Sequence, residues 1–76
     1  MTEELDRIVL VHDLAEHGLR AGDIGTVVLV HSDGGYEVEF MMLGGETVAV
    51  VSLSDDEVRP VGDREIAHAR TVETVV

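Results

Sequence analysis

Short apolar runs separated by glycines and charged residues make up most of the chain, and valine is the commonest residue in them. β-branched runs of about four to eight residues are typical of strands rather than helices. The pattern predicts five strands, at residues 5–12, 23–31, 36–43, 47–53 and 58–61. We therefore expect an all-β fold.

The connections between these runs indicate how the strands follow one another. Residues 32–35 and 44–45 contain paired glycines, which suit tight hairpins because glycine adopts positive φ without steric cost. The second, third and fourth strands should therefore form an antiparallel meander. The longer stretch 13–22 should be a surface loop, and residues 54–57 should form a single 3₁₀ turn with Ser54 as its cap.

The third run alternates between apolar and polar positions. Its even-numbered residues, from Tyr36 to Met42, should point into the core, and its odd-numbered residues, Glu37, Glu39 and Met41, should face solvent. The one-sided pattern predicts the following core for the whole domain: Ile8, Leu10, Ile24, Val27, Val38, Phe40, Val48, Val50 and Leu53.

Residues 27–30 and 48–51 differ from the third run because they are apolar on both faces. So short a chain has too few residues to cover a second apolar face fully, so either the C-terminal tail or another chain should cover it. We expect a homodimer, because twofold association is the commonest way to bury such a surface.

The C-terminal residues 63–76 form a tail rather than a separate domain. Asp63 suits a helix cap, and Ile66, Ala69 and Val72 have roughly helical spacing, so a short helix is one reading. The β-branched residues at the end favour a β-rich tail instead. We expect a helical turn or an irregular segment to about residue 70, followed by a frayed or partner-paired end.

The second run opens with the pattern G-x-x-G-x-V, in which Gly22, Gly25 and Val27 hold the fixed positions. This pattern, after a loop that returns through Gly18, resembles the KOW-type SH3-like barrel. Gly25 should let the backbone bend where a side chain would strike the opposite wall. Residues 52–61 resemble the 3₁₀ turn and last strand that end such barrels.

From residue 6 to about residue 70 the chain resembles a family of small bacterial SH3-like proteins known as a domain of unknown function. The resemblance implies a five-stranded antiparallel SH3-like barrel over residues 1–62, with the rest as its tail. It implies little about activity, because SH3-like barrels serve protein-binding, RNA-binding and enzyme-associated roles.

The net charge of the chain limits the classes of partner that it is expected to bind. Sixteen acidic residues against five arginines and no lysine give a formal charge of −11, which repels phosphate backbones and anionic membranes. The charge therefore disfavours nucleic acid as a partner, and we expect no binding to generic duplex DNA or single-stranded RNA at physiological salt. The chain has no cysteine, no secretory leader pattern and no long apolar run, which predicts a cytoplasmic protein that does not enter a membrane.

Two short motifs carry residue types used in catalysis. Residues 12–17 include His12 and His17 with two carboxylates, which could bind a metal ion if they converged, but a solvated acidic loop explains them better. His31, Ser32 and Asp33 are the residue types of a catalytic triad, yet sequence neighbours point in divergent directions. We expect no enzyme activity, no cofactor and no metal.

An acidic stripe along the third strand is the stronger candidate for a binding site. It comprises Asp33, Glu37, Glu39, Met41 and Glu46, and it would dock a basic protein partner; simple solubilisation is the alternative. The sequence thus favours a small, acidic, non-enzymatic binding module, antitoxin-like, immunity-like or accessory to an enzyme. A KOW-like RNA- or ribosome-associated domain is the second reading, and a small metal-dependent enzyme the third.

Overall fold

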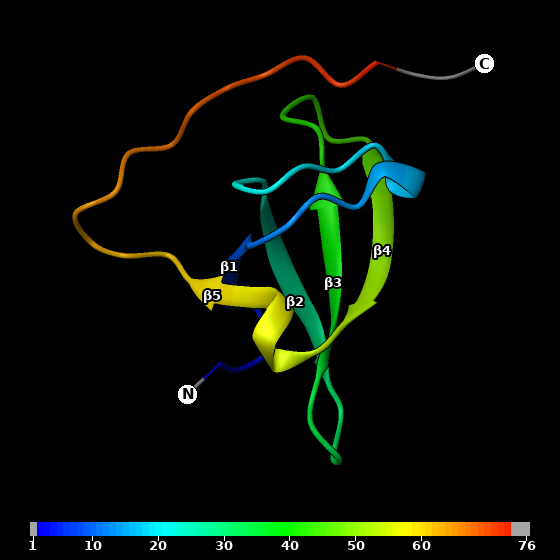
Figure 1. The fold of residues 1–76 in the computed structure, drawn as a ribbon, viewed down its shortest axis with the longest axis vertical. Coiled ribbons are helices and arrows are strands. Elements are labelled where there is room, and N and C mark those ends of the chain that lie inside the picture. The colour runs from blue at the N-terminus through cyan, green and yellow to red at the C-terminus, as the bar shows by residue number, and fades with distance from the viewer. Residues whose placement is uncertain (1, 74–76) are drawn as a thin grey trace.

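The computed structural model describes residues 2–73 and contains one antiparallel sheet of five strands (Figure 1). The strands are β1 (Arg7–Leu10), β2 (Ile24–Val30), β3 (Tyr36–Met41), β4 (Thr47–Leu53) and β5 (Val58–Pro60). Two 3₁₀ turns accompany them, η1 (Ala15–His17) in the loop after β1 and η2 (Asp55–Glu57) between β4 and β5. The predicted all-β fold is confirmed. In the described residues no helix is long and apolar enough to cross a membrane.

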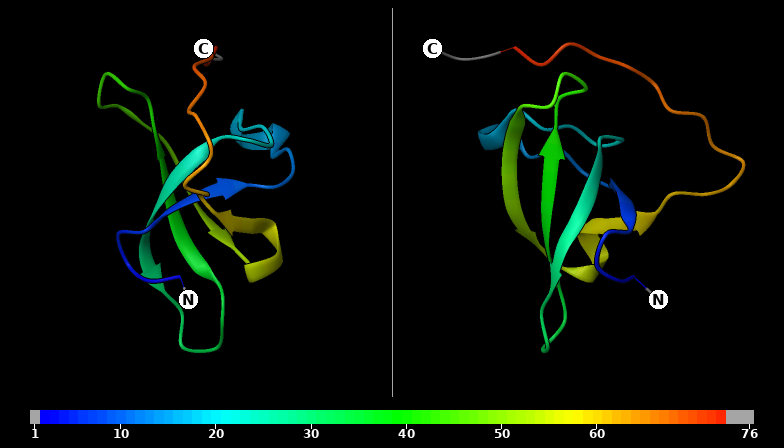
Figure 2. Two further views of the ribbon diagram at one scale, coloured as in Figure 1. Left: turned by 90° about the vertical axis from the view of Figure 1, so that its left-hand side faces the viewer. Right: turned by 180° about the vertical axis from the view of Figure 1, so that it is seen from behind.

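The strands follow the order β4-β3-β2-β1-β5 across the sheet. β2, β3 and β4 form the predicted meander, and β2 also pairs with β1. Figure 2 shows that β1 and β5 lie over one face of the layer formed by β2, β3 and β4. The core fills the space between them, which leaves the opposite face of β2, β3 and β4 toward solvent.

The β2–β3 hairpin turns as its glycines predict. The N–H of Gly34 donates to the carbonyl of His31, and the N–H of His31 donates to the carbonyl of Gly35. Gly34 and Gly35 have φ values of +94° and +93°, which side chains rarely tolerate. The paired glycines therefore fix this turn.

Six of the nine predicted core residues are buried: Ile8, Leu10, Val27, Val38, Phe40 and Leu53. Val48 is half-buried against this cluster. The predictions for Ile24 and Val50 are wrong, because these side chains are 40% and 53% exposed. On β4, a register shift between Phe40 and Met41 explains the exposure of Val50, since it places Ala49 opposite Phe40 and Val50 opposite Glu39.

Ile24 pairs with Val9 of β1, whose position alternates with Ile8 and Leu10 of the core cluster. Val9 is nonetheless buried at 5% exposure, whereas Ile24 is not covered. Leu19 joins the core from the loop after β1, where the Leu14–Leu19 bridge folds that loop over the cluster. Leu19 was not predicted because a single leucine in a polar loop has no periodic pattern.

The tail after β5 is irregular over residues 61–73, as expected, and the alternative of a short helix is wrong. A turn closes where the N–H of Glu65 donates to the carbonyl of Gly62. The predicted pairing of the C-terminal end involves Thr74, Val75 and Val76, which lie outside the described residues.

Among the glycines, Gly25 is the one at which an added side chain would meet the closest contacts. A Cβ atom added there would lie 2.6 Å from Val38 Cγ1 and 2.8 Å from Phe40 Cε2. Gly25 pairs with Ile8 of β1, and its neighbour Thr26 pairs with both Arg7 of β1 and Glu39 of β3. A side chain at Gly25 would thus strike its neighbours, as predicted, and its absence lets the Phe40 ring lie against the β2 backbone.

We expect Gly25→Ala to lower the free energy of unfolding by about 1–3 kcal/mol, because the added methyl group overpacks a closely packed site. Gly44→Ala is the matched control: nothing lies within 4 Å of its added Cβ. That control should change stability by less than about 0.5 kcal/mol. Urea unfolding of both variants measures the difference, and equal midpoints would contradict the role assigned to Gly25.

Candidate functional site

The predicted acidic stripe follows the full length of β3 and both hairpins. Glu37, Glu39 and Met41 lie on the solvent face of β3, while Asp33 lies in the β2–β3 hairpin and Glu46 in the β3–β4 hairpin. These two hairpins are at opposite ends of the sheet (Figure 1). We call these five residues the acidic face; they form a line rather than a compact cluster.

Glu37 is the most constrained member of the acidic face. Its Oε2 atom lies 2.6 Å from His31 Nε2 and also accepts a hydrogen bond from the Ser52 hydroxyl of β4. The Ser52 and His31 contacts lower the pKa of the Glu37 carboxyl. Its side chain is only 25% exposed. Less of the Glu37 carboxylate is therefore accessible to a partner than its place on the solvent face of the strand predicts.

Glu39 has one such contact, because its Oε2 atom accepts a 2.7 Å hydrogen bond from the Thr47 hydroxyl. Apolar side chains surround it on the same face. Met41 is 50% exposed, Leu29 is 46% exposed and Val50 is 53% exposed. Val50 pairs directly with Glu39, and Leu29 pairs with Glu37. Exposed apolar residues of β2 and β4 thus lie on both sides of the acidic face, as the two-sided apolar runs of these strands indicate.

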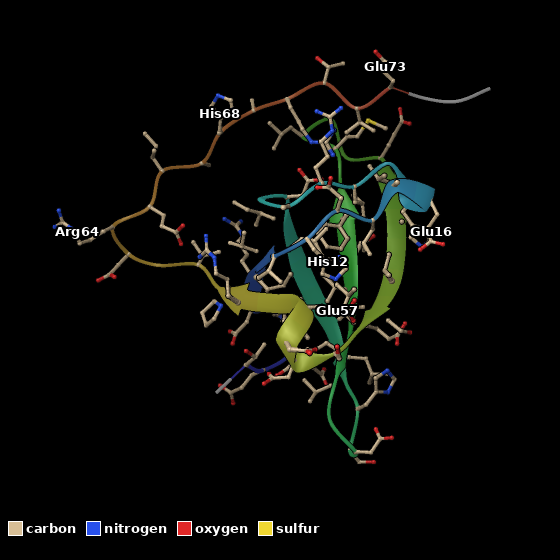
Figure 3. The ribbon with its side chains drawn as sticks, viewed as in Figure 1. His12, Glu16, Glu57, Arg64, His68 and Glu73 are labelled. Atoms are coloured by element: carbon tan, nitrogen blue, oxygen red, sulfur yellow. The ribbon has the colours of Figure 1, made fainter. Side chains whose placement is uncertain are left out.

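In the loop that contains His12 and His17, the His12 side chain contacts η2 instead of forming a metal site with the other side chains of the loop. His12 Nε2 lies 2.9 Å from Glu57 Oε2, and Figure 3 shows these two side chains facing each other while Glu16 points away. The Asp13 carbonyl and the Glu57 carboxylate raise the pKa of His12. Among residues 2–73 no group of three or more His, Asp or Glu side chains could hold a metal ion.

The residues 31–33 do not converge as a catalytic triad. The His31 imidazole is directed at Glu37 across the hairpin, 2.6 Å from its Oε2 atom, rather than at its sequence neighbours. His31 also lies apart from His12, which contacts Glu57. His31 therefore serves as a cross-strand partner for an acidic side chain.

Arg70 fastens the far part of the tail to the body of the domain. The guanidinium of Arg70 donates from Nε to Asp23 Oδ1 at 2.8 Å and from Nη2 to Asp23 Oδ2, and also to the carbonyl of Gly18 at 3.0 Å. Partial burial opposes ionisation of Asp23, but hydrogen bonds from Arg70 and from the Arg20 N–H outweigh it and lower the pKa of this carboxyl. The pair is 26% and 18% exposed, the least exposed ion pair described.

A shallow cavity of about 340 Å³ lies between this part of the tail and the loop after β1. Its lining contains two arginines and two carboxylates, so charges of both signs face a ligand there. The lining residues are Asp13, Ala15, Gly18, Leu19, Arg20, Arg70, Thr71 and Glu73. With this balance of charge the cavity has no preference for an ion of one sign.

A second arginine orders the start of the tail. Arg59 of β5 donates two 2.7 Å hydrogen bonds to the Glu65 carboxylate, and these bonds with the Gly62 N–H lower the pKa of Glu65 to about 2. The sequence does not reveal either arginine pair, because each joins the tail to a position whose place in space only the fold determines. The tail therefore lies over the loop after β1, not over the apolar positions of β2 and β4.

We expect Arg70→Gln to release residues 66–73 and to lower the free energy of unfolding by about 1 kcal/mol at neutral pH. Asp23 has a lowered pKa in the folded state, so this contribution is present above about pH 4 and disappears as the pH falls through the folded value. Amide NMR signals of the tail and unfolding at pH 7 and pH 2 measure both effects. Arg64→Gln, at an exposed tail position, is the control; equal changes in the two variants would contradict the tether.

Comparison with known proteins identifies the family and nothing narrower. Residues 4–60, which include all five strands, match the family described as "Domain of unknown function (DUF4926)". No curated protein and no solved structure matched the chain. The matched part ends with β5, so the arginine-tethered tail follows it. The chain belongs to the DUF4926 family.

Proposed function

We propose that this protein is a non-enzymatic binding module that engages a basic protein partner through the acidic face and the apolar residues beside it. The observation that supports this most directly is the composition of the solvent face of β2, β3 and β4. Leu29, Met41 and Val50 are each about half exposed there, next to the carboxylates of Glu37 and Glu39. Apolar contacts supply affinity, and complementary charge selects the partner and speeds encounter.

The charge of the whole chain supports a cationic partner. At −11 it attracts basic surfaces over the range of electrostatic screening, about 8 Å at physiological salt. A basic toxin or nuclease, inhibited as by an antitoxin-like or immunity-like protein, would fit this surface. So would a larger enzyme to which the chain is an accessory. The absence of cysteine suits a cytoplasmic location.

A fold of the SH3-like, KOW-like type is part of the proposal. Its support is the G-x-x-G-x-V pattern, the close contact at Gly25, and the position of η2 between β4 and β5. An RNA-binding role would need arginines free to neutralise phosphates. Two of the five arginines, Arg59 and Arg70, already bind carboxylates, which favours the protein partner over RNA.

The test compares two variants of equal charge. One neutralises the acidic face with Asp33→Asn, Glu39→Gln and Glu46→Gln, leaving Glu37 in its contacts with His31 and Ser52. The control neutralises Glu4→Gln, Glu16→Gln and Asp63→Asn, which are exposed and belong neither to β3 nor to its two hairpins. A protein retained from the source-cell lysate by the immobilised chain is identified, purified, and measured for its association rate with all three forms.

We expect the acidic-face variant to slow association about tenfold or more, and the control to slow it much less, because steering depends on charges near the contact. Equal slowing by the two variants would show that only the net charge of the chain matters, wherever the charges lie, and would contradict the proposed surface. Binding of RNA at micromolar affinity in physiological salt would contradict the protein-partner proposal itself.

A further inference from the structure

The two edges of the sheet are built differently. β5, at one edge, is three residues long and ends in Pro60, which has no N–H to donate. Its Arg59 side chain donates to the Pro60 carbonyl and to Glu65. Short length, proline and charge are the usual means by which proteins keep a sheet edge from pairing with another chain. The β5 edge is therefore closed to added strands.

β4, at the other edge, has none of these protections. It spans seven residues, Thr47–Leu53, without a charged side chain or a proline. It lies at the margin of the molecule in Figure 1 and in the right-hand view of Figure 2. In the described chain, no backbone–backbone hydrogen bond outside the sheet's own ladder involves residues 47–53. The N–H and C=O groups of β4 that point away from β3 are thus available to another strand.

We propose that β4 pairs with β4 of a second copy of this chain, antiparallel and centred on Val50, so that one sheet continues through both copies. A twofold axis at Val50 brings each strand against an identical uncharged strand with the same unpaired backbone groups. It also sets the Val50 side chains of the two copies against each other on the solvent face, where each is 53% exposed. The pairing uses the backbone of β4 and shares Val50 with the apolar residues beside the acidic face, but it does not depend on the proposed function.

The strong negative charge does not oppose this pairing. Glu37 and Glu39 lie on β3, one strand in from the edge. In the paired sheet the β3 strands of the two copies would be separated by both β4 strands, a distance of about 14 Å at the usual strand spacing. This exceeds the screening length of about 8 Å at physiological salt. A second copy therefore fits the β4 edge, whereas its uncharged side chains offer a basic partner no complementary charge.

The first test uses sedimentation equilibrium at high micromolar concentration. We expect the wild-type chain to dimerise and Val50→Lys to weaken dimerisation about tenfold or more, because like charges would face each other across the twofold axis. The substitution should leave the monomer folded, since Val50 is exposed and pairs with Glu39 within its own sheet. Val28→Lys is the control: this residue lies on the interior strand β2 and is 40% exposed.

A second test uses the absence of cysteine from the chain. Val50→Cys introduces a single thiol that should form a disulfide-linked dimer rapidly, because directly paired residues place their Cβ atoms within disulfide reach. Leu43→Cys, in the β3–β4 hairpin, is the control and is more accessible at 99% exposure. Faster crosslinking at Val50 despite its lower exposure supports edge pairing.

Three results would overturn the proposal. They are a strict 8.2 kDa species at every concentration, equal weakening of dimerisation by Val28→Lys and Val50→Lys, and crosslinking at Leu43→Cys as fast as at Val50→Cys. The second result would indicate a dimer that buries the sheet face instead of its edge. None of these results bears on whether a basic protein binds the acidic face.

Discussion

The close approach of β2 to Phe40 and Val38 at Gly25 is the constraint on which the rest of the structure depends. At this point β2 pairs with β1 on one side and, one residue later, also with β3. Because no side chain stands at Gly25, the Phe40 ring can lie against the β2 backbone. β1 and β5 lie over the β2–β3–β4 layer. One face of that layer becomes the core, and the other face and the free edge of β4 remain in solvent.

This division explains where binding is expected. Charged side chains of the tail and the loops already bind one another: Arg70 binds Asp23, Arg59 binds Glu65, and His12 contacts Glu57. The β2–β3–β4 layer instead presents carboxylates, exposed apolar side chains and a strand edge without charge. The acidic face suits a basic protein, and the uncharged β4 edge suits a second copy of the chain. The two surfaces belong to one layer and meet at Val50.

Much of the fold could be predicted from local patterns. The alternation in β3 placed Tyr36 and Phe40 in the core and Glu37 and Glu39 outside it, because a period of two residues maps directly onto the two faces of a strand. The same reasoning failed for Val50, since the register shift after Phe40 changes which β4 residues face inward. A run of apolar residues in the sequence gives no sign of such a shift. The His31–Glu37 and Arg70–Asp23 pairs were equally hidden, because they depend on strand register and on the path of the tail. The stripe of acidic residues was visible in the sequence, whereas its restraint by Ser52, Thr47 and His31 was not.

The central claim is that the β2–β3–β4 layer, and β4 above all, is the part of the molecule left open for association. Amide hydrogen exchange at low and high protein concentration, followed residue by residue, tests this most directly. The account predicts that alternate amides of Thr47–Leu53 exchange rapidly in dilute solution and slow markedly at high concentration, while Arg59 on the other sheet edge does not change. Exchange in β4 that is independent of concentration, or protection that arises at β5 instead, would contradict it.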